Sequence, residues 1–106
     1  MIKIKTWNIE AETGYKPMTT FYQDLSIADM FGIKAIKDTY KQVFKEWKHD
    51  YKFITEFIMA LNWKSWEHMH NEEYCALYAD LYYEARDWAF DNLKGEELQY
   101  FIEITD

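Results

Sequence analysis

The chain has 106 residues, enough for one domain, and carries a formal charge of -7. It contains 5 Trp, 9 Tyr and 7 Phe, so we expect one core that is more aromatic than aliphatic, and not a disordered chain. The negative charge disfavours direct binding of nucleic acid, because phosphate contacts need a positive surface. No apolar run exceeds five residues, too short for a membrane span or a signal peptide. We therefore expect a cytoplasmic protein that does not bind membranes.

The first residues differ in pattern from the rest of the chain. Isoleucines alternate with polar residues over 1–9, which predicts one short strand. Gly14 and Pro17 then indicate a loop. The pattern after this loop is helical, so we divide the chain into an N-terminal arm and loop (1–17) and a single helical domain (18–106).

Two helix starts are predicted directly after the loop. A hydroxyl residue followed three positions later by an amide or an acid marks a helix start, and this pattern occurs at Thr20 and again at Ser26. The second start predicts a separate short helix over 27–31 that ends at Gly32. An amphipathic helix of about four turns follows, with apolar residues spaced for one face, namely Ile33, Ile36, Tyr40, Val43, Phe44 and Trp47.

Two further long helices have predicted caps. Asp50 is the expected N-cap of a helix over 51–69, which is apolar on nearly all sides and therefore belongs in the centre of a bundle. Asn71 is the expected N-cap of the next helix, which stops near Gly95. A last short helix carries Leu98, Phe101 and Ile102. The predicted fold class is all-α, a small helical bundle of three long and two short helices.

Charge is distributed unevenly along the chain. Residues 1–66 have a net charge of +2, whereas residues 67–106 have a net charge of -9. Four lysines of the amphipathic helix lie within an arc of about 60° at 100° per residue, and a fifth lies beside them. We call this set the lysine edge: Lys34, Lys37, Lys41, Lys45 and Lys48. Lys52 extends the series if the helix continues through Asp50.

The helix that follows Asn71 has a matching row of acidic residues, with offsets of 0, 7, 11, 14 and 18. We call it the carboxylate edge: Glu73, Asp80, Glu84, Asp87 and Asp91. Both edges are typical of solvated helix flanks. Two other interpretations stay open. The edges pair with each other between helices or between subunits, or the carboxylate edge mimics the phosphates of DNA.

The same helix has more aromatic residues than one buried face can hold. Tyr83 and Phe90, seven positions apart, fall on the side away from Tyr78 and Leu81. Tyrosine and other aromatic residues are enriched in protein interfaces, although packing of the last helix also explains them. The candidate partner-binding residues are therefore Glu73, Asp80, Tyr83, Glu84, Asp87, Phe90 and Asp91.

No set of residues predicts a catalytic, metal or cofactor site. Glu46 and His49 have the spacing of one half of a di-iron motif, but there is no second copy, and His49 is expected on the side opposite Trp47. His68 and His70 diverge on a helix and are expected at a polar junction. The single cysteine, Cys75, excludes an internal disulfide and a thiolate cluster.

Four segments resemble a family of uncharacterised short acidic helical proteins carried on conjugative or phage-like mobile elements of gut bacteria. They are Phe21–Asp29, Ile36–Tyr40, Phe44–Lys48 and Asn92–Leu98. The resemblance covers residues 18–106 and implies an accessory role in a mobile element. It implies no activity, ligand or functional residue.

The sequence thus predicts a non-enzymatic protein-interaction or accessory module that acts through an acidic, aromatic-rich helix. We expect either a homodimer or a subunit bound to a partner protein, with no cofactor. The alternative is an acidic anti-restriction or anti-defence protein that mimics DNA.

Overall fold

The computed structural model describes residues 17–105, which form five helices and no strand. They are α2 (Pro17–Asp29), α3 (Ile33–Trp47), α4 (Tyr51–Glu67), α5 (Glu72–Asn92) and α6 (Glu96–Thr105). The all-α prediction is confirmed. The strand expected over residues 1–9 lies outside the described residues.

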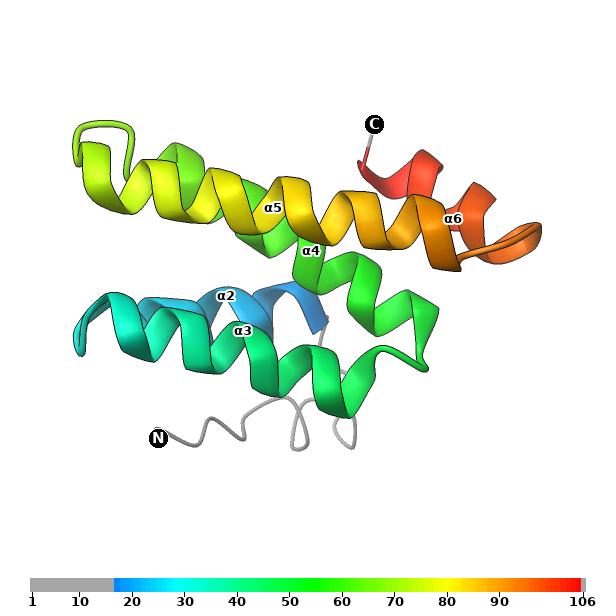
Figure 1. Cartoon of the computed structure of the whole chain (residues 1–106), viewed down its shortest axis with the longest axis horizontal. Coiled ribbons are helices and arrows are strands. Elements are labelled where there is room, and N and C mark those ends of the chain that lie inside the picture. The colour runs from blue at the N-terminus through cyan, green and yellow to red at the C-terminus, as the bar shows by residue number, and fades with distance from the viewer. Residues whose placement is uncertain (1–16, 106) are drawn as a thin grey trace.

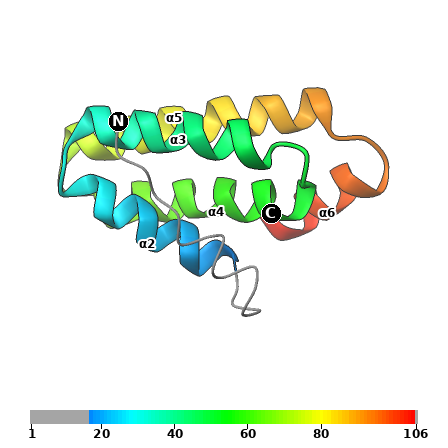
Figure 2. The same cartoon turned by 90° about the horizontal axis from the view of Figure 1, so that it is seen from below.

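The helices form two layers (Figures 1 and 2). α3 and α5 lie side by side in one layer and run in the same direction, whereas α2, α4 and α6 form the other layer. α4 contacts all four other helices, as its nearly uniform apolar surface predicts. No helix between residues 17 and 105 is long and apolar enough to span a membrane.

The core is aromatic at its centre. Phe21 and Phe57 are fully buried, with their rings edge to face and their centroids 5.3 Å apart. Phe44 of α3 meets Trp88 of α5 in the same geometry at 5.2 Å. Such pairs contribute about 0.5–1.5 kcal/mol beyond the burial of their area. Phe44 also packs edge to face on Phe57 of α4 with ring centroids 6.1 Å apart, so aromatic packing connects the two layers as well as joining α3 to α5.

Both predicted N-caps are confirmed. Asp50 Oδ1 accepts hydrogen bonds from the backbone N–H groups of Lys52 and Phe53, each at 3.2 Å. Asn71 Oδ1 accepts one from Tyr74 N at 3.4 Å. The turn before α3 requires a glycine, because Gly32 has a φ of +107°.

The second helix start, predicted at Ser26, is wrong. α2 runs without a break from Pro17 to Asp29, because the Ser26 hydroxyl donates to the carbonyl oxygen of Tyr22 at 2.9 Å within the helix and does not cap a new one. Lys52 does not extend the lysine edge either, since α3 ends at Trp47 and Lys52 belongs to α4.

Candidate functional site

The exposed aromatic residues predicted on α5 line a groove. Tyr83 is 57% exposed and Phe90 is 42% exposed, and across the groove from them Trp66 of α4 is 68% exposed. The cavity has a volume of about 370 Å³. We call it the aromatic groove, and it is lined by Asn62, Trp66, Tyr82, Tyr83, Arg86, Phe90, Ile102 and Thr105.

Packing on the last helix explains one of the two surplus aromatic residues, Phe90. Phe90 packs edge to face on Phe101 of α6, with ring centroids 5.6 Å apart, so the last helix covers one side of its ring. The Arg86 guanidinium lies 5.4 Å from the centroid of the Phe90 ring. Within residues 17–105, Tyr82 is the only aromatic ring in contact with Tyr83, whose side chain stays largely open to solvent. The groove is thus built by three helices, α4, α5 and α6, and its lining combines aromatic rings with polar groups.

All five residues of the carboxylate edge are exposed. Between residues 17 and 105, no ion pair within 4.0 Å joins this edge to the lysine edge; Lys34 pairs instead with Asp38 of its own helix at 3.1 Å. Glu84 lies close to Tyr40 of α3, and burial of the Tyr40 phenol, followed by the charge of Glu84, raises the pKa of that phenol above its ordinary 10.0. The carboxylate edge therefore lies along the α3 side of α5, next to the aromatic groove.

A buried ion-pair cluster between α2 and α4 was not predicted. The Lys64 side chain of α4 is fully buried, and its ammonium lies 2.6 Å from Asp29 Oδ2 of α2 and also pairs with Glu67. It donates a further hydrogen bond to Ser26 Oγ at 3.0 Å. His68 Nε2 lies 2.8 Å from the same Asp29 oxygen.

Two tyrosines complete this cluster. Tyr78 donates from its hydroxyl to Asp29 Oδ1 at 2.5 Å, and Tyr22 donates to Glu67. Burial, and next the hydrogen bond to Asp29, raise the pKa of Tyr78 above its ordinary 10.0. Each charged group of the cluster therefore has a partner, and the cluster ties the C-terminal end of α2 to α4 and α5.

Asp29, Glu67 and His68 place possible metal-ligand atoms within 4.8 Å of one another. The Lys64 ammonium, however, is bonded to both carboxylates and occupies the position that a cation needs. Its positive charge opposes a second cation there. His70 is exposed and does not join the cluster. This arrangement fits a structural ion-pair network better than a metal centre.

The cluster left one signal in the sequence. Lys64 follows Phe57 and Leu61 at offsets of 7 and 3, on the buried face of α4. A lysine at a core position needs a buried counter-ion. Which residue supplies it depends on how α2 packs, so Asp29 could not be assigned from the sequence.

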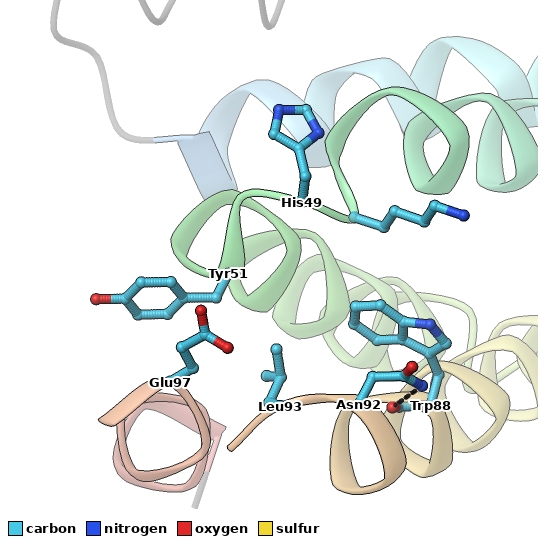
Figure 3. Close-up of a pocket in the computed structure, with 7 residues that line it drawn as sticks. His49, Tyr51, Trp88, Asn92, Leu93 and Glu97 are labelled. Carbon is cyan, nitrogen blue, oxygen red and sulfur yellow. Dashed lines mark hydrogen bonds between the residues drawn. The ribbon is translucent and has the colours of Figure 1, made fainter. Parts of the chain in front are cut away.

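A second surface pocket, of about 380 Å³, lies where α3, α4, α5 and α6 meet. Figure 3 shows that its side chains do not converge: the His49 ring points away from the Glu97 carboxylate, and Asn92 donates to the backbone oxygen of Trp88 at 2.8 Å. The expected position of His49 opposite Trp47 is wrong, because His49 follows the end of α3 and its ring stacks on Trp47. The pocket offers no set of groups arranged for one reaction.

The aromatic groove is therefore the strongest candidate site in residues 17–105. Comparison of the whole chain with models of protein families, with curated proteins and with solved structures gives no match.

Proposed function

We propose that this chain is a non-enzymatic protein-interaction module whose aromatic groove binds a basic, amphipathic segment of a partner protein. The observation that carries the proposal is the exposure of Trp66, Tyr83 and Phe90 around one groove. Exposed aromatic side chains gathered around one groove are typical of binding surfaces, and aromatic anchors that become buried dominate the affinity of protein interfaces. The accessory role in a mobile element, implied by the resemblance, belongs to the same proposal.

Charge complementarity indicates the chemistry of the partner. At 100° per residue, Asp80 and Asp87 of the carboxylate edge lie within about 60° of Tyr83 around α5. Residues 67–106 have a net charge of -9, with Arg86 and Lys94 as the only basic residues. A field of this sign attracts lysine and arginine side chains and accelerates association with a basic partner. An amphipathic helix with apolar anchors on one face and basic residues beside them fits such a groove.

The proposal is tested with a labelled synthetic helical peptide built of leucine, tryptophan and lysine, titrated with the protein by fluorescence anisotropy. We expect binding that the double substitution Tyr83→Ser and Phe90→Ser weakens by at least about tenfold, because the groove loses two aromatic anchors. The matched control is Phe31→Ser, which removes an aromatic ring that is 65% exposed but lies in the turn after α2. Unchanged affinity of the double variant refutes the proposal.

The alternative, a DNA mimic, is supported by one observation: the carboxylate edge is exposed and regular, and no ion pair within residues 17–105 ties it to the lysine edge. A lysine-only peptide of the same charge separates the two functions. The groove proposal predicts weak binding of this peptide. The mimic is supported instead if the lysine-only peptide binds as tightly as the amphipathic peptide. This binding should then be lost when Asp80 and Asp87 become asparagine but kept in the Tyr83 and Phe90 variant.

A further inference from the structure

We propose that the outer face of the α3/α5 layer binds a second copy of this chain, with the lysine edge of each copy against the carboxylate edge of the other. None of the residues that line the aromatic groove belongs to this surface, although Asp80 and Asp87 border both. The inference rests on where the two edges lie, on their register, and on the symmetry that these impose.

Both edges border the seam between α3 and α5 on the face turned away from α4. Phe44 marks the side of α3 that faces α5, and Trp88 marks the side of α5 that faces α3. At 100° per residue around the helix axis, the lysine edge lies within about 100° of Phe44, and the carboxylate edge lies within about 100° of Trp88. Each edge is on the side of its helix opposite the buried residues. Because the helices are parallel neighbours (Figures 1 and 2), both edges point out of the same face.

The two edges are also in register along the helices. Phe44 lies beside Trp88, and Tyr40 lies beside Glu84, so neighbouring positions of α3 and α5 differ by 44 in residue number. Three lysines of α3 each have a carboxylate of α5 at a residue number higher by 43. Each such pair therefore lies at the same level along the two helices to within one residue, or about 1.5 Å. These pairs are Lys37 with Asp80, Lys41 with Glu84, and Lys48 with Asp91.

A two-fold axis that lies in this face and runs parallel to the helices uses both edges fully. It places α3 of each copy over α5 of the other without a shift along the axis, so each of the three pairs forms twice. An axis perpendicular to the helices would instead place lysines against lysines, which is repulsive. The charge pattern therefore selects one dimer.

The face has the size and composition of an interface. The two longest dimensions of the molecule are 36 and 29 Å, and a rectangle of these sides, about 1,000 Å², can contain the roughly 800 Å² that each partner buries in a standard interface. Half-buried Tyr40, Phe44 and Trp88 lie between the charged edges. An apolar centre with a charged rim is the usual anatomy of such a contact.

A charge-swap experiment tests the dimer by light scattering on a size-exclusion column. We expect the unchanged protein to form a species of twice 13.0 kDa. The variant Lys37→Glu/Lys41→Glu and the variant Asp80→Lys/Glu84→Lys are each expected to be monomeric, with self-affinity at least about 100-fold weaker, because four of the six attractive pairs become repulsive. An equimolar mixture of the two variants restores complementarity on both sides and is expected to form the dimer again.

The controls reverse the same charges elsewhere. Lys52→Glu/Lys94→Glu and Glu96→Lys/Glu103→Lys are expected to keep the dimer, and so is Tyr83→Ser/Phe90→Ser, because neither aromatic residue belongs to the lysine edge or the carboxylate edge. The inference is overturned if the unchanged protein is a monomer, if the dimer survives both charge reversals, or if the dimer disappears only in the groove variant. If circular dichroism shows that Lys37→Glu/Lys41→Glu is unfolded, the milder Lys37→Gln/Lys41→Gln replaces it. Peptide binding by the groove is measured separately, so failure of the dimer leaves the proposed function standing.

Discussion

Replacing Lys64 with methionine tests the buried ion-pair cluster, because methionine fills similar space and removes the positive charge. The strongest interaction that this substitution removes is the ion pair with Asp29, whose side chain is only 14% exposed, and a hydrogen bond to a charged group contributes about 1.5–3 kcal/mol. Glu67 is 40% exposed and its ion pair adds about 0–1 kcal/mol, while the bond to Ser26 adds about 0.5–1.5 kcal/mol. We therefore expect the free energy of unfolding to fall by about 3 kcal/mol, a large part of the ~5–15 kcal/mol of a domain.

The measurement is urea unfolding followed by tryptophan fluorescence and circular dichroism. The triple variant Lys64→Met/Asp29→Asn/Glu67→Gln is expected to recover at least half of the loss, because replacing all charges of a buried cluster leaves none unpaired. The control is Lys34→Met, whose side chain is 87% exposed and whose pair with Asp38 is worth less than about 0.5 kcal/mol. A loss below about 1 kcal/mol in Lys64→Met, or a triple variant no more stable than the single one, would refute the reasoning.

Three further predictions concern stability. Gln42→Met is expected to raise the free energy of unfolding by about 1 kcal/mol in urea titrations, because both polar atoms of the buried Gln42 amide lack a hydrogen-bond partner among residues 17–105. Asp50→Ala is expected to lower it by about 1 kcal/mol through loss of the α4 cap, with a drop in melting temperature as the check. The pKa of Tyr78 is raised in the folded state, so its neutral phenol stabilises the fold below pH 10, and this contribution of Tyr78 falls above that pH by about 1.4 kcal/mol per pH unit. Tyr78→Phe is therefore expected to flatten the decline of stability with pH, as measured by unfolding between about pH 9 and pH 11. Tyr83→Phe is the control.

Features encoded locally could be predicted from the sequence. The caps at Asp50 and Asn71 need only neighbouring backbone groups, and the exposure of Tyr83 and Phe90 follows from the helical period along α5. The central position of α4 follows from its composition alone. The prediction failed at Ser26, because a cap pattern does not show whether the hydroxyl will instead bond to the preceding turn.

Features made by distant segments could not be predicted. The second wall of the aromatic groove depends on α6, whose docking brings Ile102 and Phe101 to α5. The ion-pair cluster joins Asp29 to Lys64, which lie 35 positions apart on different helices. Hydrophobic periodicity gives the face of each helix but not its neighbour.

The complete burial of Lys64 also makes this residue a chemical reporter. Its amine is enclosed by α2, α4 and α5, whereas the lysines of α3 are exposed. An amine-reactive label therefore modifies the α3 lysines in the folded chain but reaches Lys64 only after α2 separates from α4. The rate of labelling at this one position, read by mass spectrometry, measures the opening of one helix pair separately from unfolding of the whole domain.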